Sequence, residues 1–186
     1  METVKLEING KKVETEGGIT VLEAARRAGI NIPTLCYDEN LKPYGACRMC
    51  LVEIAKGTRR RLVASCAYPV EEGLVVITDT PKIQKLRKLI IELVWPSWTP
   101  LAEEYGITES RFESGLGDCN LCGLCVRYCR EIAKKNAVYF EGRGVDRHPA
   151  LVPGAGKECE ACRGCFGLCT GGWIVSAPGR AYDADA

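Results

Sequence analysis

The sequence predicts an α+β fold with a small strand-rich N-terminal domain, a helical connector and a cysteine-rich C-terminal domain. Three observations predict it: alternating strand patterns open the chain, a well-capped helix follows them, and one cysteine run occurs twice in the last third. The chain has 186 residues, which is enough for one or two domains. Its 46% apolar and 26% charged residues are typical of a globular protein.

Residues 1–80 are predicted to form a β-grasp domain, in which small mixed strands surround one helix. Asn9-Gly10 is a favoured type I′ hairpin turn, and Thr20 with Glu23 forms a capping box at the start of the helix. The predicted strands are Thr3–Ile8, Lys11–Thr15, Leu51–Ile54, Leu62–Ser65 and Leu74–Asp79.

Residues 81–117 are predicted to form the helical connector. Pro81 suits the first position of a helix, apolar residues then recur at helical spacing, and Pro96 ends the pattern. Trp95 and Trp98 are interpreted as packing residues at the domain junction, because burying apolar area is the usual role of tryptophan.

The charge and the segment pattern exclude several classes of protein. The net charge is +1, from 25 basic and 24 acidic residues, so the sequence does not indicate a nucleic-acid-binding surface. The N-terminus lacks the pattern of a signal peptide, and no apolar run approaches the roughly 20 residues of a transmembrane segment. We therefore expect a cytoplasmic protein whose closely spaced cysteines bind metal rather than form disulfides.

The first cysteine set has the spacing C-x10-C-x2-C-x15-C and consists of Cys36, Cys47, Cys50 and Cys66. Three thiolates on one loop and a distant fourth can enclose a two-iron rhomb, with two sulfurs per iron, so we expect a [2Fe–2S] cluster. A zinc ion would more often use two C-x2-C pairs, of which only one is present, and zinc remains the alternative.

The run C-x2-C-x2-C-x3-C begins at Cys119 and again, forty residues later, at Cys159. In bacterial ferredoxins, such a run gives three thiolates to one cubane and the fourth to its neighbour. Two copies predict two [4Fe–4S] clusters in a bacterial-type 2[4Fe–4S] ferredoxin domain over residues 118–186. The expected ligand sets are Cys119, Cys122, Cys125 and Cys169 for one cluster, and Cys159, Cys162, Cys165 and Cys129 for the other. Paired zinc sites are the alternative.

Small and cationic residues accompany these ligands. The small ones are Gly45, Ala46, Gly123, Gly164 and Gly167. We expect them to let backbone N–H groups approach sulfur, which raises the reduction potential of a cluster, although each glycine could also serve a simple turn. The cationic ones are Arg48, Arg127, Arg130 and Arg163. They could favour the more negative, reduced clusters or be solvated surface residues.

Several segments resemble the N-terminal iron–sulfur region of the large iron–sulfur subunit of complex I. They are residues 34–37 (TLCY), 45–53 (GACRMCLVE), 65–67 (SCA), 105–108 (YGIT), 111–112 (RF), 129–132 (CREI) and 142–144 (GRG). The same module occurs in the small diaphorase (iron–sulfur) subunit of NAD-linked hydrogenases, in NAD-linked formate dehydrogenases and in [FeFe]-hydrogenases. The resemblance covers nearly the whole chain. It implies an N-terminal β-grasp [2Fe–2S] ferredoxin-like domain and an oxidoreductase (NADH dehydrogenase-like) context.

The sequence departs from these relatives at two places. They commonly carry a further cluster held by one histidine and three cysteines, but residues 81–118 contain neither residue type, so we expect that cluster to be absent. Thr170 follows the last cysteine where the relatives have proline. Proline is not a ligand, so the second run should still bind its cluster.

No catalytic residues are predicted. All twelve cysteines are used by the three sets, and neither a phosphate-binding glycine loop nor a nucleophile–base pair is visible. His148, which precedes Pro149, is interpreted as a loop residue. The leading hypothesis is an electron-transfer subunit that relays single electrons between an NAD(P)H-linked flavin subunit and a catalytic partner of a multisubunit oxidoreductase. The alternatives are a free-standing soluble ferredoxin and a zinc-structured interaction module.

Overall fold

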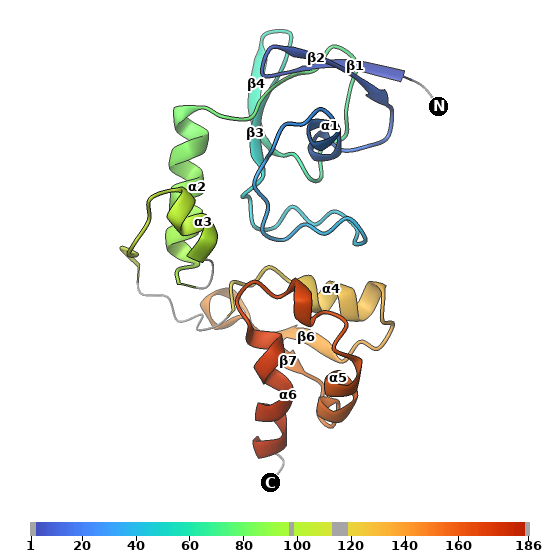
Figure 1. Ribbon diagram of the computed structural model, residues 1–186, viewed down its shortest axis with the longest axis vertical. Coiled ribbons are helices and arrows are strands. Elements are labelled where there is room, and N and C mark those ends of the chain that lie inside the picture. The colour runs from blue at the N-terminus through green and yellow to red at the C-terminus, as the bar shows by residue number, and fades with distance from the viewer. Residues whose placement is uncertain (1–2, 97–98, 113–118, 185–186) are drawn as a thin grey trace. The chain divides into compact units, whose positions relative to one another are not determined.

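The computed structural model describes residues 3–96, 99–112 and 119–184 (Figure 1). Its contacts divide the chain into two units: Met1–Tyr37 with Pro43–Ile90, and Asp38–Lys42 with Ile91–Ala186. The division after Ile90 falls inside the predicted connector. The predicted boundary between residues 117 and 118 lies outside the described residues.

The first unit is built on a mixed five-stranded sheet with the order β2-β1-β5-β3-β4. Its strands are β1 (Thr3–Ile8), β2 (Lys11–Glu16), β3 (Leu51–Lys56), β4 (Arg59–Ala64) and β5 (Val75–Ile77). β1 and β5 are parallel, and the other neighbouring pairs are antiparallel. The predicted hairpin turn is confirmed, because Asn9 and Gly10 both have positive φ, as a type I′ turn requires.

Four of the five strands differ from their predicted bounds because pairing partners decide where a strand begins and ends. β2 ends at Glu16 rather than Thr15, and β3 ends at Lys56 rather than Ile54. β4 begins at Arg59 rather than Leu62, since a tight turn with Gly57 at φ 61° lets Lys56 pair directly with Arg59. β5 has three residues rather than the predicted six, since it pairs with only two residues of β1 and three of β3.

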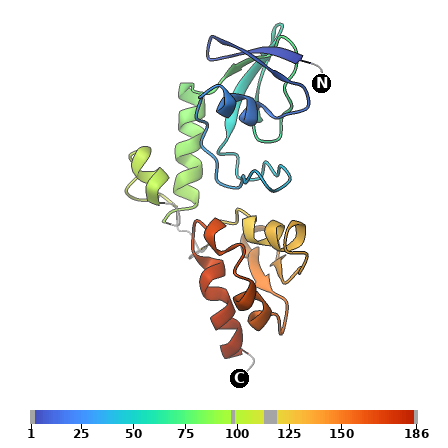
Figure 2. The same ribbon diagram turned by 45° about the vertical axis from the view of Figure 1, so that its right-hand side comes forward.

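Helix α1 (Val21–Arg27) lies against one face of this sheet (Figure 2). Its predicted capping box is confirmed: the Glu23 N–H donates to Thr20 Oγ1 at 3.3 Å, and the Thr20 N–H donates to Glu23 Oε2 at 2.7 Å. The helix and sheet share a core of fully buried side chains, each of which contributes roughly 1.5–3 kcal/mol by leaving water. They include Ile8, Val21, Leu22, Val52, Leu74 and Val76. This core fixes both ends of the loop that carries the first cysteines.

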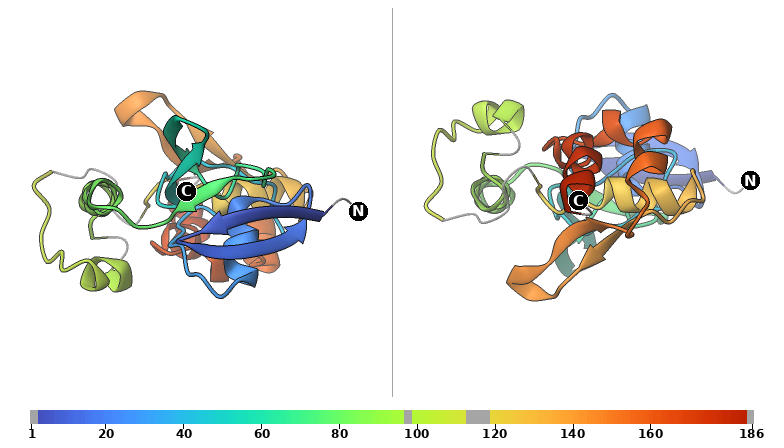
Figure 3. Two further views of the ribbon diagram at one scale, coloured as in Figure 1. Left: turned by 90° about the horizontal axis from the view of Figure 1, so that it is seen from above. Right: turned by 90° about the horizontal axis from the view of Figure 1, so that it is seen from below.

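The second unit contains short helices and one hairpin. The chain passes from the first unit to the second along α2 (Pro81–Leu93). The elements that follow are α3 (Thr99–Glu104), α4 (Leu124–Glu131), β6 (Val138–Glu141), η1 (Gly144–Asp146), β7 (His148–Leu151), α5 (Gly156–Cys162), η2 (Phe166–Leu168) and α6 (Trp173–Ala184). β6 and β7 pair antiparallel and project as a ribbon from the helices of their unit (Figure 3). Ile174 of α6 is fully buried and belongs to a core cluster that includes three of the unit's cysteines.

Three sequence interpretations concern this part of the chain. His148 is not a loop residue: it opens β7 opposite Glu141, and its ring Nδ1 lies 2.7 Å from the Asp146 carbonyl. α3 lies within the predicted helical connector, where the sequence located only the helix that ends before Pro96. Trp95 is half-buried, whereas Trp98 lies outside the described residues and its packing role stays a prediction.

None of the helices in the described part of the chain combines the length and apolar character that crossing a bilayer requires.

Candidate metal centres

The structure brings Cys36, Cys47, Cys50 and Cys66 together as two thiol pairs in the first unit. Cys36 is hydrogen-bonded to Cys47, and Cys50 is hydrogen-bonded to Cys66. Charge interactions of Cys47 with Cys50 and of Cys36 with Cys66 connect the pairs. Three of the thiols are 1% exposed, and only Cys47 is partly open to solvent. Four cysteines that span thirty positions of the sequence therefore meet at one place, where their sulfurs form two pairs.

In each pair, the hydrogen bond lowers the pKa of one thiol and raises the pKa of the other. The Cys36 thiol donates to Cys47 and lowers the pKa of Cys47 to about 6, and Cys66 likewise lowers that of Cys50 to about 7. The same bonds, followed by burial, raise the pKa of Cys36 and Cys66. Since thiolates rather than thiols bind metal, two of the four groups are ready to ligate near neutral pH.

Backbone N–H groups surround the sulfurs of the first set. The Gly45 N–H bonds to Cys66 and the Ala46 N–H to Cys36, which confirms what the sequence predicted for these two small residues. The Met49 N–H also points to Cys47 Sγ, at 3.5 Å. Arg48 takes a left-handed φ of 61°, an uncommon backbone state for a residue other than glycine that turns the chain around the sulfur.

Arg87 of α2 hydrogen-bonds to the backbone beside this turn, a role that no sequence pattern indicated. Arg87 is 3% exposed, and its guanidinium donates to the carbonyls of Met49 at 3.2 Å, Leu51 at 2.9 Å and Thr78 at 3.0 Å. Charge-assisted hydrogen bonds are stronger than neutral ones. Arg87 therefore fixes the backbone on both sides of Cys50.

In the second unit, one cavity is lined by a group of four cysteines drawn from both runs: Cys119, Cys122, Cys125 and Cys169. Burial raises the pKa of Cys122 to about 11 and raises that of Cys125 as well, and the neighbouring thiols of the group add to both shifts. The last cysteine of the second run therefore lies with the first three of the first run.

The remaining four cysteines form the reciprocal group. Burial raises the pKa of Cys165 to about 12, and the next contributions come from Cys159, Cys129 and Cys162. Cys159 likewise has its pKa raised by burial, then by Cys129 and Cys162. Cys162 is exposed, unlike its three neighbours. The fourth cysteine of each run thus lies with the first three of the other. Among the described residues, no three potential ligands converge closely enough to hold a single metal ion.

N–H groups point at sulfur here too, but from residues other than the predicted glycines. The Leu121 N–H donates to Cys119 Sγ at 3.3 Å, the Leu124 N–H to Cys122, and the Ala137 N–H to Cys129 Sγ at 3.1 Å. Leu121 adopts a φ of 55°, which strains a bulky side chain and is typical of a functional turn. Ala137 lies outside both runs, so their spacing contained no signal for it.

Two of the small residues serve other purposes. A Cβ on Gly164 would lie 2.7 Å from the Tyr128 ring, so this glycine gives the ring room. Gly123 begins α4 with a φ of 72°. A Cβ on Gly167 would meet no atom within 4 Å, and nothing in the structure explains this glycine. Thr170, which stands where the relatives have proline, accepts a hydrogen bond from Asn120 Nδ2 at 2.6 Å.

Of the four arginines noted beside the ligands, only Arg127 is buried. It is 5% exposed and its Nη1 donates to the Lys42 carbonyl at 2.7 Å, while its charge lowers the pKa of Cys122 against the larger effect of burial. Arg48, Arg130 and Arg163 are not buried, and the latter two form surface ion pairs with Glu131 and Glu160.

Comparisons with known proteins confirm the predicted resemblance. Residues 1–81 match the model of the 2Fe-2S iron-sulfur cluster binding domain. The chain is 33% identical to an NADH-quinone oxidoreductase subunit of Rhizobium meliloti, over 95% of this chain and 24% of that protein. It is also 33% identical to the NADPH-Fe(3+) oxidoreductase subunit alpha of Geobacter sulfurreducens, over 94% of this chain and 24% of that protein.

A solved structure shares the fold as well. A chain of an NAD+-reducing [NiFe]-hydrogenase in the H2-reduced state superposes with a TM-score of 0.70 at 28% identity, covering 82% of this chain and 76% of that one. The chain spans about a quarter of the length of the two curated relatives named above.

Proposed function

Because residues 1–81 match the 2Fe-2S iron-sulfur cluster binding domain and the chain resembles subunits of NADH-linked complexes, we propose that it is an iron–sulfur electron-transfer subunit. It would relay single electrons between an NAD(P)H-linked flavin subunit and a catalytic oxidoreductase partner. The observation that carries the proposal is the grouping of twelve cysteines into three sets of four.

In the first unit, we propose Cys36, Cys47, Cys50 and Cys66 as the ligands of the [2Fe–2S] cluster. Their pairwise arrangement fits a two-iron rhomb, which needs two sulfurs per iron. When bound, such a cluster supplies one-electron transfer. The chain contributes the thiolates, the N–H donors that stabilise negative charge on sulfur, and a nearly complete exclusion of water from three of the four ligands.

In the second unit, we propose a bacterial-type 2[4Fe–4S] ferredoxin domain. The exchange of fourth cysteines between the runs supports it, because each cubane in such a domain takes three ligands from one run and one from the other. The left-handed turn at Leu121 and the N–H groups directed at Cys119 and Cys129 also suit ligands that carry negative charge.

Anaerobic purification from the native host tests the proposal. We expect about ten iron atoms and about ten sulfides per chain, from one two-iron and two four-iron clusters, with separate electron paramagnetic resonance signals for the two cluster types. Native mass spectrometry should recover the chain with a flavin-containing subunit. Zinc without iron or sulfide would refute the electron-transfer role, and a cluster-loaded chain that purifies alone would indicate a free-standing ferredoxin.

A further inference from the structure

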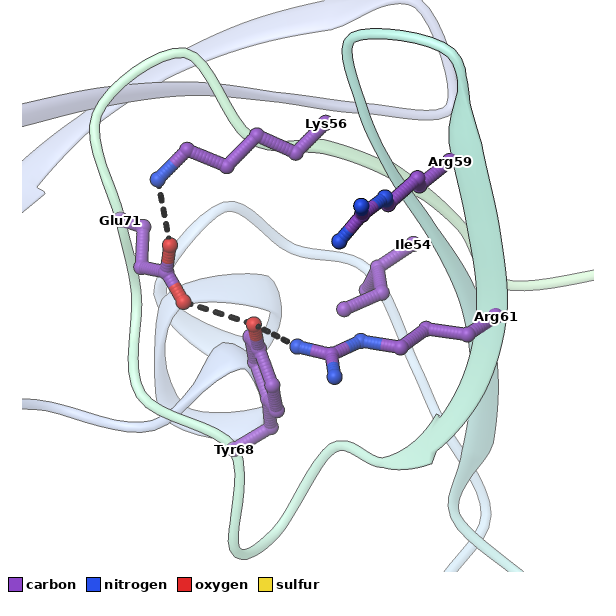
Figure 4. Close-up of a pocket in the computed structure, with 6 residues that line it drawn as sticks. All are labelled: Ile54, Lys56, Arg59, Arg61, Tyr68 and Glu71. Carbon is purple, nitrogen blue, oxygen red and sulfur yellow. Dashed lines mark hydrogen bonds and ion pairs between the residues drawn. The ribbon is translucent and has the colours of Figure 1, made fainter.

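The first unit has a basic cavity of about 340 Å³ that contains no cysteine (Figure 4). Ile54 of β3, 3% exposed, contributes apolar surface to it. The other lining residues are Lys56, Arg59 and Arg61 from the β3–β4 hairpin, and Tyr68 and Glu71 from the segment before β5. Three cations and one carboxylate give the lining a net charge of about +2 at neutral pH.

Glu71, which supplies the carboxylate of this cavity, already accepts hydrogen bonds from two other lining residues. Lys56 Nζ donates to Glu71 Oε2 at 2.6 Å, and Tyr68 Oη donates to Glu71 Oε1 at 2.6 Å. Arg61 Nη2 donates to Tyr68 Oη at 2.8 Å, and its guanidinium lies 5.3 Å from the centre of the Tyr68 ring. Among the described residues, no side-chain hydrogen bond or ion pair involves Arg59. Within the described structure, neither guanidinium forms an ion pair with a carboxylate, although the charge of Arg61 also acts on Glu71 from a longer distance.

These two arginines lie on a strand whose outer edge is open. β4 is the last strand of the sheet, and no strand in the described residues pairs with its far side. Alternate residues of a strand face the same side, so Arg59 and Arg61 share the cavity face. Arg60 faces the opposite side, where it forms an ion pair with Glu53 at 3.1 Å.

We propose that the edge of β4, with Arg59 and Arg61, binds an extended acidic segment of a partner protein. An added strand would hydrogen-bond to the free backbone of β4, and Asp or Glu at its alternate positions would meet the two guanidinium groups. The cavity gives these carboxylates room. This inference rests on the proposed function only in that it requires a partner subunit.

Basic residues on an edge strand also keep sheets from aggregating, and charge reversal separates the two roles. The double variant Arg59→Glu/Arg61→Glu keeps the edge charged but removes its complementarity to an acidic segment. Arg60→Glu is the matched control, with the same change on the same strand but the other face. The complex is purified from the native host through a tag on this chain, and its subunits are quantified by native mass spectrometry at increasing salt.

The expected result is at least a tenfold loss of one partner subunit from the double variant, with the control retaining the partner. Iron content and cluster signals should stay normal in both variants, which shows that the chain is folded and keeps the test independent of the proposed cluster ligation. Equal recovery of all subunits from both variants overturns the inference. So does a wild-type chain that purifies alone with its clusters intact.

A zero-length carbodiimide cross-link in the purified complex locates the partner. With Arg59→Lys, we expect the new amine to couple to Asp or Glu residues of a partner subunit, whereas Arg60→Lys should couple to Glu53 of its own chain. Coupling from position 59 only within its own chain contradicts the docking. Saturable binding of inorganic pyrophosphate to the isolated chain, lost in the double variant, would assign the cavity to a soluble anion and overturn the protein partner.

Discussion

Removing the buried charge of Arg127 should make one four-iron cluster harder to reduce. Arg127 is 5% exposed, and its charge favours the thiolate of Cys122, a proposed ligand. Reduction adds one negative charge to a cluster, so a nearby cation stabilises the reduced state more than the oxidised state. Arg127→Gln removes the charge and keeps a polar side chain at this position, but it gives up the hydrogen bond from Nη1 to the Lys42 carbonyl.

The size of the shift follows from Coulomb's law. At ~8 Å, an ordinary separation for a side chain near ligands of the same helix, and an effective dielectric of ~20, one charge contributes about 2 kcal/mol. A one-electron potential changes by ~59 mV for each tenfold change in equilibrium, which is about 1.4 kcal/mol, so the midpoint should fall by roughly 90 mV.

A redox titration followed by electron paramagnetic resonance measures this midpoint. Arg127→Lys keeps the charge and should stay near the wild-type potential. Arg130→Gln is the matched control, because Arg130 lies on the same helix but its side chain is 64% exposed and paired with Glu131. An unchanged midpoint in Arg127→Gln with full iron content would refute the reasoning, as would an equal shift in the Arg130 variant.

Four further outcomes are expected. Arg87→Ala should lower the free energy of unfolding by about 3 kcal/mol in urea denaturation, because three carbonyls lose a charged donor, and a loss below about 1 kcal/mol would contradict this. Gly164→Ala should destabilise by about 1–3 kcal/mol through its clash with Tyr128, and Gly167→Ala should be nearly neutral in the same assay. Cys47→Ser should abolish the [2Fe–2S] resonance and leave the four-iron signals; an unchanged resonance would exclude Cys47 as a ligand. In metal-free protein, alkylation of Cys47 by iodoacetamide should decline as pH falls through about 6, where its thiolate becomes protonated, and a midpoint near 9 would show that its pKa is not lowered.

Local chemistry made much of the first unit predictable. The Asn9-Gly10 turn and the Thr20 capping box depend on residues next to one another, so the sequence alone was sufficient to predict them. Arg87 could not be found in this way. It appears as one basic residue among several on a helix, and only the folded chain places its guanidinium beside the carbonyl of Met49, thirty-eight positions earlier.

The cysteine grouping was predictable for a different reason. The spacing within each run limits which thiols can reach a common centre, and the fourth cysteine of each run follows after a longer step. The N–H donors of the second unit were not predictable from this spacing, unlike those of Gly45 and Ala46 in the first unit. The sequence pointed to glycines, whereas Leu121 and Ala137 supply the donors because of backbone turns that residue type does not specify.

The elements of the second unit escaped prediction because its core contains little of the usual apolar signal. The main core of the first unit has sixteen buried residues, of which two are cysteines, whereas the described core of the second has eight, of which three are cysteines. A helix whose buried face is partly cysteine shows weak apolar periodicity, and α4 and α5 are of this kind. The same composition makes stability depend on ligation: burial raises the pKa of Cys122 and Cys165 well above 9, so without metal the fold is left with protonated thiols in place of metal–thiolate bonds. In the second unit, the cysteines therefore have two effects. They weaken the apolar pattern by which its helices could be predicted, and as proposed ligands they would let bound metal hold those helices together.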